Sequence, residues 1–306
     1  MVEPGAQGTL AEEVGRQTWY HTISLPDGSS TDGVFDMRRP ASAMQWPAAL
    51  SKGRCLDIGT CDGFWAFEME RRGASEVVAI DVAHANDVDL TWEGRQRAAT
   101  MPGDQGGTRA GQRFKLASRV LKSRVKRLEC SVYELDPALH GTFDVVFCGT
   151  LLIHLRDPVL ALERMRGVCK GELVMVECVD ACLDIFAPGR PAARFEPAQG
   201  QWWRANRAGL VSVLKAAGFE TISRGSPFIT PFGAGMTGRG SRRRRLFAML
   251  TNLLGRWPRQ AGASWIAIGV GLLWGSYDIV IRARPLQPQG PDPGMAGTAH
   301  SSGDPA

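Results

Sequence analysis

Residues 55–70, CLDIGTCDGFWAFEME, constrain the fold more than any other part of the chain. The apolar start, CLDI, predicts a strand buried on both faces, as in a parallel sheet. Gly59 and Gly63 follow where the backbone must turn sharply and can approach a ligand closely. A helix is predicted from Asp62 to about Arg72. A strand, a glycine turn and a helix in this order predict an α/β fold of the Rossmann-like kind.

A second predicted strand, VVAID, ends in Asp81. A glycine turn after one strand and a carboxylate after the next is the layout of a nucleotide-type site. The turn holds one end of the ligand, and the carboxylate binds two ribose hydroxyls.

Two ligands suit this layout, and Asp57 distinguishes them. A dinucleotide site has the pattern G-x-G-x-x-G, whereas here Asp57 precedes the first glycine and Cys61 stands between the two glycines. An acid there would repel a pyrophosphate but can bind a cationic amino group, as in S-adenosyl-L-methionine (SAM) sites. We therefore predict that Asp57, Gly59, Gly63 and the backbone of Cys61 bind the methionine end of SAM. The alternative is a Rossmann-like core whose tight turn binds no nucleotide.

The length of 306 residues allows one domain of about 200–250 residues with extensions. We predict an N-terminal extension and covering segment over residues 1–50 and a SAM-binding domain over 51–283. A helical insertion is expected at 228–274, before the last strand, and a disordered tail at 284–306.

The composition is ordinary for a globular protein, with a net charge of +5 that permits an anionic partner without requiring one. Seven cysteines without a C-x-x-C pair favour reduced thiols in a cytoplasmic enzyme, and we expect no metal site. The N-terminus lacks the apolar core of a signal peptide. The longest apolar run, 265–275, is shorter than the roughly 20 residues that span a bilayer, so no transmembrane segment is expected.

The N-terminal part is expected to cover the site. Residues 1–16 are predicted to be disordered, and the turn at 26–28 predicts a hairpin or covering flap. Trp19, Tyr20 and His21 could then fold over the ligand and contact the substrate, although Trp19 could equally be a packing residue. A short helix is expected at 40–50.

The middle of the chain combines an irregular stretch with a basic helix. Residues 83–111 predict a long loop, a possible lid. The helix expected within 113–127 has one apolar and one basic face, which is either a solvated surface or an RNA-binding surface. A third strand is expected at 127–130, after which Ser131 and Val132 would line the adenine.

The second half supplies the expected catalytic edge. Residues 143–148 predict a central parallel strand, and Gly149 with the following loop, which contains His154, would lie at the ligand-binding edge. A helix is predicted at 158–168 and a fifth strand at 172–179. The last strands are expected at 219–222 and 277–283, with a helix at 207–217 capped by Asn206 before them.

Two segments are candidates for acceptor recognition. The irregular stretch 180–206 contains Trp202 and Trp203, which either wall a substrate pocket or form a satellite core. Residues 241–257 combine a basic cluster with an apolar-rich helix, which could contact a membrane surface or hold a lipid-like or polyanionic substrate. A helical cap on the domain is the alternative.

The glycine turn, VVAID, FDVVFCGTLLIHLRDP, AAGFETI and YDIVIRARP together resemble class I SAM-dependent methyltransferases over most of residues 19–283. The resemblance implies a seven-stranded sheet with an antiparallel edge. The N-terminal segment, the turn and the LLIH-x-RDP loop resemble the subgroup that completes uridine 5-oxyacetic acid at the tRNA wobble position with carboxy-SAM. That subgroup binds the extra carboxylate with a Lys, a Tyr and an Arg, where this chain has His21, Ile153 and Tyr277. We therefore expect plain SAM.

The expected reaction is an in-line methyl transfer, in which positioning alone can supply about 7–11 kcal/mol. His154, and second His21, are candidate general bases if the acceptor is a hydroxyl; a structural role is the alternative for His154. The acceptor is predicted to be a small molecule, glycan or lipid-like metabolite. An RNA acceptor and a SAM-binding scaffold without activity are the alternatives.

Overall fold

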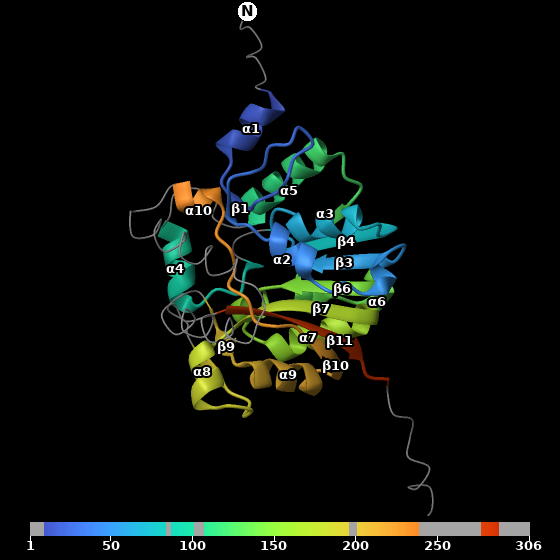
Figure 1. The fold of residues 1–306 in the computed structure, drawn as a ribbon, viewed down its shortest axis with the longest axis vertical. Helices are drawn as coiled ribbons and strands as arrows, with labels where there is room; N and C mark the ends of the chain where they lie inside the picture. Colours follow the sequence, from blue (N-terminus) through green and yellow to red (C-terminus); the bar gives the residue numbers. More distant parts are fainter. Residues whose placement is uncertain (1–8, 84–86, 101–106, 196–200, 239–276, 288–306) are drawn as a thin grey trace, which may run out of the picture.

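In a computed structural model, the structure describes residues 9–83, 87–100, 107–195, 201–238 and 277–287. Within these residues seven strands form one sheet in the order β10-β11-β7-β6-β3-β4-β5 (Figure 1). The central strands are parallel, and β11 runs antiparallel to both β7 and β10. The predicted seven-stranded sheet with an antiparallel edge is confirmed. The strands are β3 (Arg54–Ile58), β4 (Glu76–Asp81), β5 (Lys126–Glu129), β6 (Phe143–Gly149), β7 (Cys169–Val179), β10 (Phe219–Arg224) and β11 (Tyr277–Pro285).

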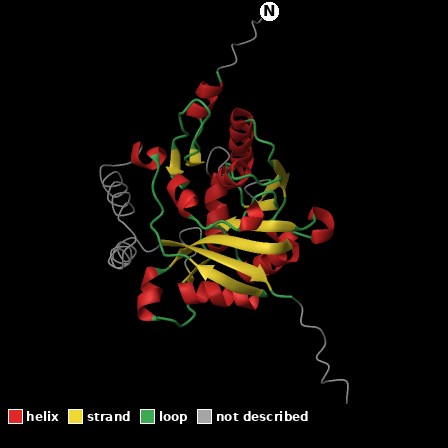
Figure 2. Cartoon of the chain, turned by 45° about the vertical axis from the view of Figure 1, so that its right-hand side comes forward, coloured by secondary structure: helices red, strands yellow, loops and turns green. Residues whose placement is uncertain are grey.

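Helices cover both faces of the sheet (Figure 2). One face packs against α3 (Phe64–Arg71), α5 (Gly107–Leu121) and the N-terminal segment in one apolar cluster. The other packs against α7 (Pro158–Val168) and α9 (Arg207–Ala216) in a second cluster. Coverage on both sides explains the continuously apolar central strands.

The face under α3 carries a row of functional groups at the carboxyl edge of the parallel strands. Side chains alternate between faces along a strand, so this face presents Asp81 on β4, Asp57 on β3, Gly149 on β6 and Cys178 on β7. Asp278 on β11 lies directly opposite Cys178. Five strands thus contribute to one edge.

The N-terminal part is more ordered than predicted. Residues 10–16 form a helix, α1 (Leu10–Arg16), because Thr9 and Glu12 close a capping box. The turn at 26–28 is flanked by an antiparallel bridge between Ser24 and Ser30, as a hairpin requires. The strands outside it, β1 (Trp19–His21) and β2 (Gly33–Phe35), pair in parallel. The helix expected at 40–50 is divided into α2 (Arg38–Ala43) and a 3-10 turn, η1 (Ala48–Leu50), because Pro47 interrupts it.

Two stretches predicted to be irregular contain regular elements. In 83–111 lie α4 (Trp92–Thr100) and the beginning of α5. In 180–206 lie α8 (Ala181–Phe186) and the antiparallel pair β8 (Ala193–Phe195) and β9 (Trp203–Ala205). Asp180 caps α8 by accepting a hydrogen bond from the backbone N of Leu183. The prolines of this stretch favoured the prediction of a loop, although Asp180 is a typical residue for the start of a helix.

The remaining described elements are short. They are η3 (Val132–Glu134), α6 (Pro137–His140), η4 (Leu152–His154) and α10 (Ala234–Gly238). Most of the predicted insertion, including 241–257, and the tail from residue 288 lie outside the described residues. Within the described part of the chain, no helix has both the length and the apolar character needed to cross a membrane. The domain boundaries stay predictions.

Candidate active site

The glycine turn joins β3 to α3 through three residues with positive φ: Gly59 at 70°, Cys61 at 52° and Gly63 at 94°. A Cβ atom at Gly63 would lie 2.4 Å from the ring of Phe67, so this position excludes any side chain. The helix begins at Phe64, two residues later than predicted, because the left-handed Gly63 is its N-cap. The turn thereby leaves bare backbone next to the carboxyl edge.

Asp57 lies at the base of the turn and is 1% exposed. Its Oδ2 atom has no hydrogen-bond partner among the described residues. Burial is the main cause that raises the pKa of Asp57 to about 7. A buried carboxylate oxygen without a partner is unfavourable by itself. An ammonium group would satisfy it, so the site fits the amino group of SAM.

Asp81 ends β4 beside the same turn. Its Oδ2 accepts a hydrogen bond from the backbone N of Cys61 at 2.8 Å, and its Oδ1 accepts one from the backbone N of Val82 at 2.8 Å. Burial raises the pKa of Asp81, although these two bonds oppose the rise. The carboxylate is partly exposed and each oxygen keeps a second lone pair. Asp81 can therefore accept further hydrogen bonds, as ribose hydroxyls require.

Ser131 and Val132 follow β5, next to Asp81, whose carbonyl accepts a hydrogen bond from the backbone N of Cys130 at 2.9 Å. Ser131 caps η3, and the side chain of Val132 is buried in the core against α7. The two residues reach the predicted edge of the sheet. The core burial of Val132 leaves mainly its backbone for ligand contact.

The N-terminal segment is fastened to the turn by Asp62, which the sequence analysis did not identify. Asp62 is fully buried and accepts hydrogen bonds from the backbone N of Tyr20 at 3.0 Å and of His21 at 2.7 Å. The Nδ1 atom of His21 lies 2.6 Å from its Oδ1 atom. An acid following the glycine turn, with a histidine in a preceding aromatic segment, is the signal that could have revealed this contact.

The aromatic residues of that segment take different positions. Trp19 is 2% exposed and its indole N–H donates to the carbonyl of Val14, so its side chain is a packing residue of the core. His21 is buried, and its ring stacks on Phe64 with centroids 5.2 Å apart. Tyr20 is 38% exposed by residue, and its ring meets Phe35 edge-on at 5.1 Å. The structure thus brings Tyr20 and His21, but not Trp19, to the turn.

The loop after β6 contains His154 in η4. Glu177, fully buried on β7, ties this loop to the sheet by accepting hydrogen bonds from the backbone N of Leu152 at 2.8 Å and of Cys178 at 2.9 Å. Burial raises the pKa of Glu177 to about 8. His154 is half-buried at the same edge as Gly149. Its position agrees with the predicted loop, and its catalytic role stays a prediction.

Trp202 and Trp203 lie over this loop. The Trp202 indole N–H donates to the carbonyl of Asp89 at 2.5 Å, and the Trp203 indole N–H donates to the carbonyl of Arg156 at 3.1 Å. Both rings contact Phe195 on the adjoining strand, at 6.0 and 5.1 Å. Phe195 and Trp203 are exposed, so these rings contact one another at the surface, and the role of the pair in a substrate pocket stays a prediction.

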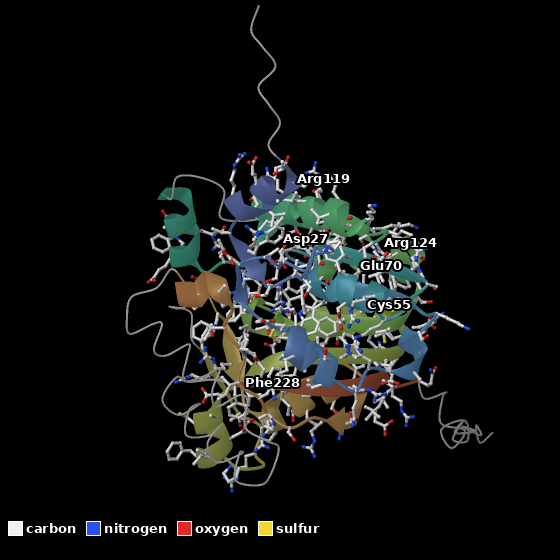
Figure 3. All side chains as sticks on the ribbon, turned by 45° about the horizontal axis from the view of Figure 1, so that its top comes forward. Asp27, Cys55, Glu70, Arg119, Arg124 and Phe228 are labelled. Atoms are coloured by element: carbon white, nitrogen blue, oxygen red, sulfur yellow. The ribbon has the colours of Figure 1, made fainter. Side chains whose placement is uncertain are left out.

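The basic surface is largely paired with acidic side chains (Figure 3). Arg119 pairs with Glu13 at 2.8 Å, Lys126 with Glu76 at 2.8 Å, and Arg124 with Glu70 at 3.7 Å. These pairs reduce the charge that an RNA backbone would meet. The helix predicted within 113–127 ends earlier than expected, because α5 ends at Leu121 and β5 begins at Lys126.

The curated relatives that the chain resembles are tRNA U34 carboxymethyltransferases. The one from Trichodesmium erythraeum (strain IMS101) is 29% identical over 112 residues, 36% of this chain and 34% of that protein. The one from Desulforapulum autotrophicum (strain ATCC 43914 / DSM 3382 / VKM B-1955 / HRM2) is 26% identical over 183 residues, 58% of this chain and 47% of that protein. The chain thus spans between a third and a half of the length of these relatives.

Two solved structures are similar to the chain at low identity. A 1,6-didemethyltoxoflavin-N1-methyltransferase from Burkholderia thailandensis, with S-adenosylhomocysteine bound, is 17% identical with a TM-score of 0.46, covering 81% of this chain and 78% of that one. The N-terminal domain of EvdMO1, in the presence of S-adenosylhomocysteine and D-fucose, is 18% identical with a TM-score of 0.46, covering 90% and 94%.

A family model described as a methyltransferase domain matches residues 36–224, which include the glycine turn, Asp81 and the loop after β6. This match extends over more than half of the chain. The protein therefore belongs to the methyltransferase domain family.

Proposed function

We propose that this protein transfers the methyl group of SAM to a hydroxyl or other heteroatom of a small molecule, glycan or lipid-like metabolite. The observation that carries the donor half of the proposal is the unpartnered, buried oxygen of Asp57 beneath the glycine turn. In this proposal Asp57 holds the amino group, the backbone at Gly59, Cys61 and Gly63 borders the methionine part, and Asp81 holds the ribose. SAM supplies an activated methyl group when it is bound.

The edge also supports plain SAM as the donor. Asp57 and Asp62 are buried carboxyl groups near the methionine end, and a further carboxylate on the donor would be repelled by those that are ionised. At the positions aligned with the carboxylate-binding residues of the carboxy-SAM enzymes, Ile153 is buried in the core and the Tyr277 hydroxyl bonds to Asp184. Neither side chain is available to hold such a carboxylate.

Aromatic side chains support a small or lipid-like acceptor. Tyr20, Phe35 and Phe232 form a continuous contact, with Phe35 and Phe232 stacked at 5.6 Å. These rings join the N-terminal segment to the stretch before α10, beside the carboxyl edge. An apolar wall that excludes water favours transfer from a sulfonium, because the donor's charge disappears in the transition state. His154 and His21 stay the predicted bases of this scheme.

A tRNA or other RNA acceptor is the second candidate, favoured by the similarity to tRNA U34 carboxymethyltransferases. The ion pairs on the basic surface count against it. Labelled SAM, incubated with the protein and with separated small molecules, lipids and RNA from its source, decides between the two. Label in the small-molecule or lipid fraction supports the proposal, and label in RNA alone overturns it.

A further inference from the structure

Asp278 is a buried carboxylate at the acceptor end of the edge that the SAM site does not use. It begins β11, is 2% exposed, and its Oδ1 accepts a hydrogen bond from the thiol of Cys178 at 3.0 Å. Its backbone is fixed by two hydrogen bonds with Phe228, at 2.8 and 2.9 Å. The thiol of Cys178 therefore holds the carboxylate, and the pairing with Phe228 holds the backbone of Asp278. Neither contact requires the carboxylate to be charged.

Asp278 and Asp57 lie on the same face of the sheet, with β6 and β7 between β3 and β11. Three strand spacings separate them across the sheet, about 14 Å. Asp57 is level with Arg282 through β6 and β7, so Asp278 also lies four residues further along the strands, about 13 Å. Between them β6 ends in Gly149, where a Cβ atom would lie 2.9 Å from the ring of Phe147 and 3.1 Å from the indole nitrogen of Trp65. The rings of Phe147 and Trp65 therefore lie close to the backbone of Gly149 on this face and leave no space for a side chain at this position.

Tyr20 closes this space from the N-terminal segment. Burial of its hydroxyl, with the nearby charges of Cys178, Asp278 and Asp62, raises its pKa well above the usual value. The hydroxyl therefore stays protonated and can donate a hydrogen bond. The residue as a whole is 38% exposed because one edge of the ring faces solvent, whereas the hydroxyl end points inward among these groups.

The charged and titratable groups facing Asp278 come from three elements. They are Cys178 on β7, Arg204 on β9 and Tyr20 on β1, while Glu177 on β7 acts on Asp278 from the opposite face of the sheet. Burial raises the pKa of Asp278 to about 6, opposed by the Cys178 thiol and by Arg204. At neutral pH the side chain is mainly a carboxylate, yet it accepts a proton more readily than an exposed aspartate. A general base is most effective when its pKa lies near the working pH.

We propose that Asp278, in place of the predicted bases His154 and His21, is the general base, and that the acceptor is an uncharged O–H or N–H group lying between Gly149 and Asp278. This rests on the proposed methyl transfer. The heteroatom forms its bond to the methyl carbon as the carbon–sulfur bond breaks, and the sulfur keeps that electron pair. The proton of the heteroatom passes to a carboxylate oxygen of Asp278. The products are the methylated acceptor, S-adenosylhomocysteine and a neutral Asp278. A carboxylate or phosphate acceptor is excluded by repulsion.

The first test is Asp278→Asn, with transfer of label from SAM to the small-molecule fraction of a source extract as the assay. We expect the rate to fall by about 10²–10⁴-fold, while calorimetric SAM affinity stays within about twofold. The wild-type rate should rise as the pH increases through about 6, and the variant should lose this rise. The control is Glu172→Gln, which removes a carboxylate paired with Arg282 on the same two strands at the opposite end of the sheet.

A second readout needs no acceptor. The charge of Asp278 helps to hold the pKa of Cys178 above its usual value. Asp278→Asn should therefore speed alkylation of Cys178 by iodoacetamide, followed by peptide mass mapping, whereas Glu172→Gln should leave it unchanged. An unchanged alkylation rate in Asp278→Asn would show that the carboxylate does not act on this thiol and would overturn the placement.

The outcomes separate the two proposals. If the wild-type protein does not bind SAM, the proposed function itself is overturned. The same holds if it binds SAM but transfers no label to any fraction. Normal SAM binding and normal transfer in Asp278→Asn overturn only the role of Asp278. A carbon-13 methyl label identifies the product: an O-methyl ether or N-methyl signal supports the acceptor class, and a methyl ester contradicts it.

Discussion

The donor and acceptor halves of the edge are built from the chain in different ways. The donor half takes Asp57, the glycine turn and Asp81 from one continuous stretch, residues 55–81. The acceptor half takes Tyr20, Cys178 and Asp278 from segments far apart in the sequence. Both halves place a buried carboxylate on the same face of the sheet. The difference shows that a local motif specifies the donor, whereas the acceptor depends on the order of strands.

The largest effect is expected from Asp57→Asn, which should weaken SAM binding by at least about 100-fold, since removing one partner of a buried charged pair costs about 3–5 kcal/mol. The same change should raise the melting temperature of the cofactor-free protein at pH 8. The pKa of the buried acid is raised from its ordinary value to about 7, so folding is penalised increasingly as the pH rises between these values. Calorimetry and thermal unfolding measure both effects.

Asp27→Asn is the matched control, because this carboxylate is fully exposed at a surface turn (Figure 3). It should leave both SAM affinity and the melting temperature unchanged. Equal losses in the two variants would contradict a local donor site.

Asp62→Ala should have the next largest effect, about 3 kcal/mol on the free energy of unfolding, because several bonds to a buried charge are lost. It should also open residues near Tyr20 to limited proteolysis. Burial raises the pKa of Asp62, but the charge and bonds of His21 lower it overall. This contribution is therefore present above the unfolded-state pKa and is lost as the pH falls through the lower, folded-state pKa. If Asp62→Ala is as resistant to protease as the wild type, Asp62 does not hold the N-terminal segment against the glycine turn.

Gly63→Ala should destabilise the fold by about 2 kcal/mol more than Gly28→Ala. Both glycines have positive φ, at 94° and 86°, so both variants share the cost of a left-handed backbone. Only at Gly63 would the added methyl group meet the Phe67 ring, whereas nothing lies within 4 Å at Gly28. Urea denaturation of the two variants isolates the steric part, and equal values would mean that the turn has more room than the structure shows.

The smallest effect is expected from Arg119→Ala, which removes an exposed ion pair with Glu13. Such pairs contribute about 0–1 kcal/mol. SAM affinity and label transfer to small molecules should not change. A marked loss of methyl transfer to RNA in this variant would show that α5 contributes to acceptor binding and would favour the RNA alternative.

The donor half could be predicted because its residues are close in sequence and the backbone conformation or strand position requires each of them. Gly59 and Gly63 need positive φ, and Asp57 and Asp81 end adjacent strands. The individual strands followed from their apolar residues, and the seven-stranded sheet with its antiparallel edge followed from the resemblance. The helix α7 also begins and ends at the predicted residues, since Asp157 and Pro158 mark its first turn.

The acceptor half could not be predicted in this way. Asp278 is the one acidic residue of β11, and no local pattern marks it. Its position against Cys178 follows only from the pairing of β11 with β7. Asp62 likewise lies within a predicted helix start, and its partners, Tyr20 and His21, come from a segment whose path over the turn no local pattern specifies.

The account is tested most directly by measuring SAM affinity and methyl transfer in Asp57→Asn and Asp278→Asn side by side. It predicts that Asp57→Asn loses SAM binding by at least about 100-fold. It also predicts that Asp278→Asn binds SAM within about twofold of the wild type but transfers methyl groups at least about 100-fold more slowly. Equal effects of the two changes on SAM affinity would contradict the division of this edge into a donor half and an acceptor half.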